Sequence, residues 1–201
     1  MIWLPEIIEP ADNFAKFFNR PDNKISEIRN VWCLNYRNQG TSDHNDSYDM
    51  DELSNDIMRF MDQEKITLAT IGGHGFGAKV AAATAINNMD RFTGVIQLEG
   101  GPLPHIYYDA WQELKSYVAH AQSMNLEEMD HATACRELEK GIHCKKWASI
   151  FKQNLNDEGA LSWKFNLEAL HSNMRKHQPD VGNWQESYGL WPGQTLAIFA
   201  A

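Results

Sequence analysis

The chain carries a glycine-rich turn at the place where a nucleophile would be held. The residues run Gly73-His74-Gly75-Phe76-Gly77, after an apolar run at 66–71 and before an alanine-rich segment. A strand, a tight glycine turn and a helix in this order follow the pattern G-x-S-x-G, whose serine is a nucleophile. Gly75 stands at the serine position, and glycine has no side chain that a base could activate. Its four neighbours would then only shape the turn: Gly73, His74, Phe76 and Gly77.

The elements that position this turn follow from the spacing of the apolar residues. The sequence predicts strands at 2–4, 28–35, 66–71, 92–98 and 195–201, and helices at 13–19, 50–61 and 76–88. Asp49, with Glu52 three residues later, resembles a capping box at a helix start. Because strands and helices alternate, we expect an α/β fold with a mostly parallel sheet of about five strands flanked by helices.

Residues 105–177 show a different pattern. Apolar positions recur there at helical spacing, and no clear strand interrupts them. No repeat or linker divides the chain. The sequence therefore predicts a single domain over 1–201, with a core of 1–104 and 178–201 and a helical lid insertion at about 105–177.

Composition limits the partners and cofactors that we expect. The formal net charge of -9 disfavours nucleic acid as a partner. No apolar run approaches the ~20 residues that a membrane-spanning helix needs. The three cysteines, an odd number, fit free thiols in a reducing compartment better than a disulfide framework. We predict no cofactor and no metal.

Four motifs, in order along the chain, resemble those of the α/β-hydrolase fold family, and most closely its small esterases of the α/β-hydrolase domain-containing protein 11 type. Residues 73–79 resemble the family's G-H-S-M-G-G-K, and residues 35–42 its D-x-R-N-H-G-x-S. Residues 99–102 take the place of D-I-S-P, and residues 163–170 that of W-R-V-N-L-x-A-L. The resemblance implies the α/β-hydrolase fold over nearly the whole chain.

The departures from these motifs concern the catalytic groups. Gly75 replaces the nucleophile, and Glu99 replaces the family's Asp. The family's oxyanion loop, L-H-G, aligns with Leu4-Pro5-Glu6, so that Pro5 and a carboxylate lie where an oxyanion would form. The family's catalytic His follows a further strand, beyond residue 201. These differences predict a catalytically inactive pseudoenzyme of the serine-esterase type with no catalytic residue.

The resemblance also implies an incomplete sheet. In the family, two strands precede the first residue of this sequence, and a strand and a helix follow its last. We therefore expect bare sheet edges near residues 28–35 and 195–201, covered by other protein subunits. The predicted role is a structural or accessory subunit of a larger complex. Because the family has mitochondrial members, the predicted location is mitochondrial, for example in a respiratory-chain assembly, and otherwise cytoplasmic.

Other readings of the same residues remain open. His74 could be a replacement base or a residue that packs under the turn. Cys33 could be a buried core residue or a substitute nucleophile, which would need an exposed thiol of low pKa. A partner chain could complete a split esterase or thioesterase, or the old cleft could hold a small ligand. Four residues could supply zinc ligands, although their spacing matches no common pattern: His131, Cys135, His143 and Cys144.

Overall fold

The computed structural model describes residues 1–100, 109–176 and 191–199 of the chain. They belong to two compact units, and each is described by itself. The described part of the first unit comprises residues 1–36, 49–100 and 191–199, and that of the second 37–48 and 109–176. The second unit thus includes a segment, 37–48, that the sequence did not separate from the core. The single-domain assignment stays a prediction.

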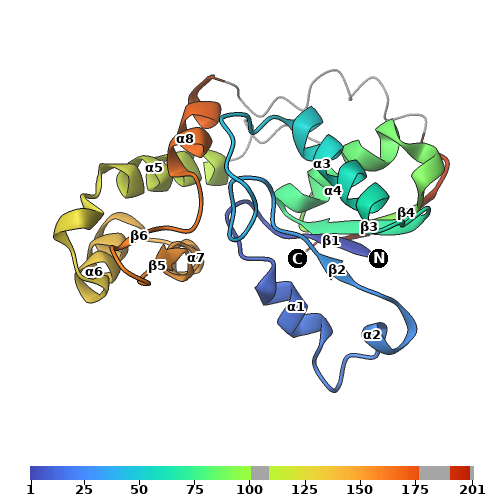
Figure 1. The fold of residues 1–201 in the computed structure, drawn as a ribbon, viewed down its shortest axis with the longest axis horizontal. Coiled ribbons are helices and arrows are strands. Elements are labelled where there is room, and N and C mark those ends of the chain that lie inside the picture. The colour runs from blue at the N-terminus through green and yellow to red at the C-terminus, as the bar shows by residue number, and fades with distance from the viewer. Residues whose placement is uncertain (101–108, 177–190, 200–201) are drawn as a thin grey trace. The chain divides into compact units, whose positions relative to one another are not determined.

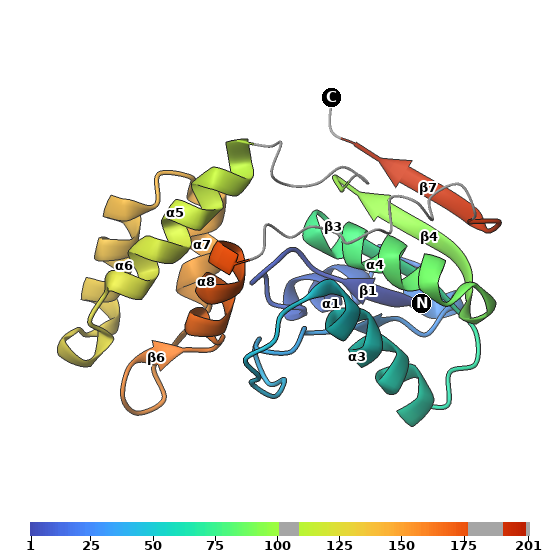
Figure 2. The ribbon, with the colours of Figure 1, turned by 90° about the horizontal axis from the view of Figure 1, so that it is seen from above.

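A five-stranded sheet forms the centre of the first unit (Figures 1 and 2). Its strand order is β2-β1-β3-β4-β7. The strands are β1 Ile2–Leu4, β2 Trp32–Cys33, β3 Ala69–His74, β4 Phe92–Leu98 and β7 Gln194–Ile198. Every pairing between them is parallel. This arrangement confirms the predicted fold class, in which a mostly parallel sheet of about five strands is flanked by helices.

Helices cover both faces of this sheet (Figure 1). The first unit has α1 Asp12–Phe18, α2 Ile25–Ile28, α3 Met50–Gln63, α4 Phe76–Asn87 and the 3-10 turn η1 Met89–Arg91. Figure 1 shows α3 and α4 on one face and α1 on the other. On the α1 side, the Trp3 ring packs against the rings of Phe14 and Phe18, with centroids 5.3 Å and 5.5 Å apart. Asp49 begins α3 as predicted, because its side chain accepts the Glu52 N–H at 3.0 Å.

Three predicted strands differ from the observed ones. The strand predicted at 195–201 is Gln194–Ile198, and residues 200–201 of that prediction lie outside the described residues. The strand predicted at 66–71 is Ala69–His74, because the Ile66 N–H still bonds back to the Met61 carbonyl at the end of α3. The strand predicted at 28–35 is reduced to Trp32–Cys33. Ile28 instead ends the short helix α2, and 77% of its surface is exposed. The Asn23 side chain starts that helical turn by accepting the Ile25 N–H.

The second unit is mainly helical. Its elements are α5 Asp109–Ser123, η3 Leu126–Glu128, α6 His131–Gly141, α7 Lys145–Gln153, β5 Leu155–Asn156, β6 Ser162–Trp163 and α8 Leu167–Lys176. The expectation of no strand in this region is wrong, since β5 and β6 pair antiparallel. Each has only two residues, which is too short for a visible alternation of apolar and polar residues. No described helix has the length and apolar character that crossing a bilayer requires.

Candidate active site

The turn between β3 and α4 has the backbone of a nucleophile elbow. Gly75 lies between them with φ 54° and ψ −113°, a conformation that an L side chain rarely adopts. Gly77 permits the close approach of α4 to the end of β1, because a Cβ there would lie 2.3 Å from the Leu4 carbonyl oxygen. The Gly75 N–H bonds to the Leu98 carbonyl of β4, which fixes the turn at the sheet end. The geometry of an elbow is therefore present although the serine is not.

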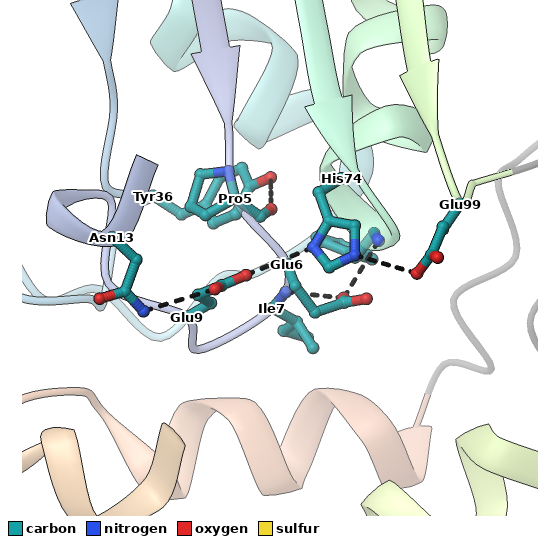
Figure 3. Close-up of polar contacts among 9 residues, drawn as sticks. Pro5, Glu6, Ile7, Glu9, Asn13, Tyr36, His74 and Glu99 are labelled. Atoms are coloured by element: carbon teal, nitrogen blue, oxygen red, sulfur yellow. Dashed lines mark hydrogen bonds and ion pairs between the residues drawn. The ribbon is translucent and has the colours of Figure 1, made fainter. Parts of the chain in front are cut away.

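The Glu6 carboxylate lies against this elbow (Figure 3). Its Oε1 accepts the Phe76 N–H at 3.0 Å and the Ile7 N–H at 2.8 Å. Phe76 follows the nucleophile position, and Ile7 belongs to the loop after β1 that aligns with the family's oxyanion loop. An oxyanion hole consists of two such N–H groups directed at one oxygen. In this structure the oxygen that they bind belongs to the chain itself.

Glu6 also occupies the space of the missing side chain. A Cβ built on Gly75 would lie 1.8 Å from Glu6 Oε2 and 2.6 Å from its carboxyl carbon. Atoms that are not bonded to each other do not approach so closely, so the observed Glu6 conformation needs a glycine at position 75. The replacement of the nucleophile and the carboxylate in the oxyanion loop are thus parts of one local arrangement.

The loop that carries Glu6 has a strained backbone. Ile8, two residues further on, has φ 58°, which is unusual for a β-branched residue, and its side chain is 1% exposed. The Tyr36 hydroxyl donates to the Pro5 carbonyl at 2.8 Å on the other side of Glu6. Burial of Ile8 and the Tyr36 hydrogen bond therefore hold the loop in the conformation that directs Glu6 toward the elbow.

Lys79 adds a buried amine one helical turn after the elbow. It lies on α4 and is only 1% exposed. Burial lowers the pKa of its ammonium group to about 8, while the negative charge of Glu6 acts in the opposite direction. In the sequence this lysine stood out only as the last residue of the motif at 73–79. Its place as the one charged residue of an alanine-rich helix was the signal that could have drawn attention to it.

His74 lies between two carboxylates (Figure 3). Its Nδ1 is 3.4 Å from Glu9 Oε2, and its Nε2 is 3.4 Å from Glu99 Oε2. Burial acts to raise the pKa of Glu9, but the hydrogen bonds from His74 and Asn13 and the charge of His74 hold it below its usual value. The ring also contacts Phe14, with centroids 5.8 Å apart. His74 and Glu99 are thus neighbours, and Glu9 is a member of this group that the sequence did not indicate.

Other candidate residues lie outside this group. Burial raises the pKa of the Cys33 thiol to about 11, with a contribution from the charge of Asp12, so its thiolate is disfavoured as a nucleophile. Of the four possible zinc ligands, His131 and Cys135 do meet, with Nδ1 and Sγ 3.7 Å apart on α6. Within the described ranges no group of three His, Cys, Asp or Glu residues has the arrangement of a metal site.

The fold and the elbow together define the class of the protein: the chain has the α/β-hydrolase fold. A marine microorganism esterase superposes on it with a TM-score of 0.81 at 17% identity, covering 100% of this chain and 86% of the esterase. The thioesterase domain from the curacin biosynthetic pathway gives 0.68 at 18% identity, covering 98% and 73%. Likeness at such low identity shows the fold alone.

Sequence comparison gives a narrower resemblance, to the ABHD11 proteins. The chain is 25% identical over 179 residues to the sn-1-specific diacylglycerol lipase ABHD11 of Xenopus laevis, covering 86% of this chain and 55% of the lipase. It is 30% identical over 78 residues to ethanol acetyltransferase 1 of Kluyveromyces marxianus, covering 38% and 22%. No protein-family model matches it. The chain thus spans about half the length of the ABHD11 proteins that it matches.

These comparisons correct one prediction. The departures from the family's motifs at Gly75, Glu99, Pro5 and Glu6, with no His at the catalytic position, led us to expect a pseudoenzyme, and this expectation is wrong. The similar proteins are named as lipases, esterases and a thioesterase, so the comparisons do not support an inactive protein. The roles assigned to Gly75, Glu99, Pro5 and Glu6 from the sequence stay predictions.

Proposed function

We propose that the chain binds an ester or thioester at the elbow and hydrolyses it, with water as the nucleophile and Glu6 as the general base. The observation that carries this proposal is the convergence of the Ile7 and Phe76 N–H groups on one oxygen position beside Gly75. Two N–H groups in this arrangement stabilise the oxyanion of an acyl-transfer reaction. The resemblance to esterases and lipases supports the same class of reaction.

The proposed reaction begins when the substrate carbonyl oxygen replaces Glu6 Oε1 between the two N–H groups. A water molecule beside Gly75 then takes the place of the serine hydroxyl. It attacks the carbonyl carbon while Glu6 accepts its proton, and the oxyanion forms against Ile7 and Phe76. When the bond from carbon to the leaving oxygen or sulfur breaks, that atom takes the proton from Glu6. The products are a carboxylic acid and an alcohol or thiol, and no covalent enzyme intermediate forms.

The test is steady-state hydrolysis of short-chain esters and thioesters by the purified protein. Glu6→Gln keeps the size of the side chain but removes the base, so we expect kcat/KM to fall about 10²- to 10⁴-fold. Glu27→Gln, which changes an exposed carboxylate on α2, is the matched control and should retain the wild-type rate. The wild-type protein should also be insensitive to a fluorophosphonate that modifies activated serines.

Two results would contradict the proposal. One is the absence of saturable turnover by the wild-type protein across the substrate panel. The other is turnover that Glu6→Gln leaves intact, because the reacting group would then lie elsewhere. Activity that appears only when a second polypeptide is added would support the split-enzyme alternative instead.

A second role, compatible with the first, is that of a subunit in a larger assembly. It is favoured by the outer strand β7, where apolar side chains reach the surface: Leu196 is 54% exposed, Ile198 47% and the following Phe199 60%. β7 pairs with β4 alone among the described strands, so its other edge is a sheet edge there. Strand edges with apolar side chains favour association with another protein. We propose other protein subunits as partners at β7 and at the opposite edge strand, β2.

Light scattering of the purified protein tests this role. Leu196→Lys together with Ile198→Lys should shift an assembly or self-associated form toward monomer, because the double change replaces the exposed apolar side chains of β7 that a partner would cover. Thr195→Lys changes the neighbouring residue of the same strand and serves as the control for added charge. A wild-type protein that remains monomeric at all concentrations and copurifies with no partner would argue against the subunit role.

We propose a mitochondrial location for this assembly, and a respiratory-chain complex as one host. The support is the resemblance to a family with mitochondrial members. Fractionation of cells expressing the tagged full-length protein tests the location. Recovery in the cytosolic fraction alone would contradict it.

A further inference from the structure

The oxyanion hole already holds a carboxylate, and this carboxylate is part of the chain. We propose that Glu6 is a displaceable internal ligand, and that the external ligand this site accepts in its place is a small carboxylate. The inference uses the same site as the proposed function but does not depend on turnover. It assigns a binding chemistry to a place where the sequence motif suggested only a lost nucleophile.

The geometry matches that of a bound carboxylate. One oxygen, Oε1, accepts two N–H groups from different elements, the loop after β1 and the start of α4. Hydrogen bonds from N–H groups to a carboxylate are stronger than those to a neutral acceptor, and a helix start favours negative charge. The buried Lys79 lies close enough for its charge to interact with that of Glu6. A carboxylate therefore meets two hydrogen-bond donors and a favourable charge at this place.

The space at the site has the size of a small carboxylate. Gly75 has no Cβ, and Glu6 Oε2 fills the space that a Cβ would need, lying 1.8 Å from the ideal Cβ position. Beyond its Cβ, the Glu6 side chain is a CH₂ group with a carboxylate, which has the same heavy atoms as acetate. Truncation to alanine therefore removes an acetate-shaped group and leaves its donors in place.

Displacement of Glu6 is favoured by its position in the chain. Glu6 lies in a loop, between β1 and α1, and it is only half-buried. The same loop contains the strained backbone of Ile8, with φ 58°. Movement of the loop can relieve that strain, which offsets part of the cost of removing the internal ligand. An external carboxylate competes with a tethered one, so it should bind the wild-type protein weakly.

The experiment is an acetate titration followed by the backbone amide resonances of Ile7 and Phe76. In Glu6→Ala these two resonances should move in a saturable way, at an acetate concentration about tenfold or more below that needed by the wild-type protein, which keeps its tethered competitor. Glu6→Gln, whose neutral amide binds the N–H groups less strongly than a carboxylate, should fall between them. This comparison decides the matter if Glu6→Ala does not fold.

Glu9→Ala is the matched control, because it removes a half-buried carboxylate of the same loop that contacts His74 and not the two N–H groups. Its Ile7 and Phe76 resonances should respond to acetate as those of the wild-type protein do. Sodium chloride at equal ionic strength should leave all variants unshifted. The inference is overturned if acetate moves neither resonance in Glu6→Ala and Glu6→Gln, or if Glu9→Ala responds as Glu6→Ala does.

The outcome is separable from that of the proposed function. Acetate binding without ester turnover would support the proposal that Glu6 is an internal ligand and contradict the proposed hydrolase activity. Turnover that depends on Glu6, without acetate binding in either Glu6 variant, would support the proposed hydrolase activity and contradict the proposal that Glu6 is a displaceable internal ligand.

Discussion

At residue 75 the missing side chain and the neighbouring carboxylate depend on each other. The Glu6 carboxylate that accepts the Phe76 N–H fills the space that the Cβ of a serine at position 75 would need. The motif made the loss of the nucleophile visible, and the alignment with L-H-G placed Glu6 beside the oxyanion. Neither could predict that the Glu6 carboxylate and a side chain at position 75 would fill one volume, because the separation of residues 6 and 75 along the chain does not give their distance in space. Only the paired fold brings β1 beside β3.

A double-mutant cycle tests this dependence. Gly75→Ser should lower the free energy of unfolding by about 1–3 kcal/mol, because the new Cβ collides with the Glu6 carboxylate. Combined with Glu6→Gly, it should cost less than the sum of the two single changes, by about 0.5 kcal/mol or more. Urea unfolding measures all four proteins.

The control for this cycle is Gly159→Ser. Gly159 also has a positive φ, 91°, but nothing lies within 4 Å of its Cβ position. Gly159→Ser therefore measures how much free energy of unfolding is lost by placing a side chain on a positive-φ backbone when no collision occurs. Additive effects of Gly75→Ser and Glu6→Gly would show that the two positions do not share one space.

At the scale of elements, local signals predicted helix starts well and strand ends poorly. The elbow, α4 and β4 lie where the sequence placed them, because the glycine turn separates a strand from an alanine-rich helix and the apolar run of β4 has clear ends. The errors at β2 and β3 arose because apolar residues also precede each observed strand in the sequence. Ile28 looked like a strand residue, yet it lies exposed at the end of α2. Burial depends on the tertiary fold, so apolar character alone could not separate these cases.

The start of α3 provides a prediction at this scale. Asp49→Ala removes the side chain that accepts the Glu52 N–H at 3.0 Å, so we expect a loss of about 1 kcal/mol in the free energy of unfolding. Asp49→Asn keeps an acceptor and should be nearly neutral. Urea unfolding at neutral pH compares the two. An equal loss in both variants would mean that the carboxylate acts through its charge on the helix and not as the cap acceptor.

At the scale of the whole molecule, the sheet links the two proposed roles. Its inner strands β1 and β3 carry the elbow and the oxyanion loop, and its outer strands β2 and β7 carry exposed apolar residues such as Trp32 and Leu196. Chemistry at the sheet centre and contacts at its edges can therefore coexist in one chain. The sequence could predict five parallel strands, because the order of elements determines it. It could not predict that residues 37–48 join the second unit, since that grouping rests on contacts distant in sequence.

We expect the elbow to act through Glu6 in place of a serine. This expectation is tested most directly by the ratio of kcat/KM between the wild-type protein and Glu6→Gln for one thioester, measured beside Glu27→Gln. We expect saturable turnover by the wild type, a ratio of about 10² or more for Glu6→Gln, and a ratio near one for Glu27→Gln. A ratio near one for Glu6→Gln would contradict this expectation.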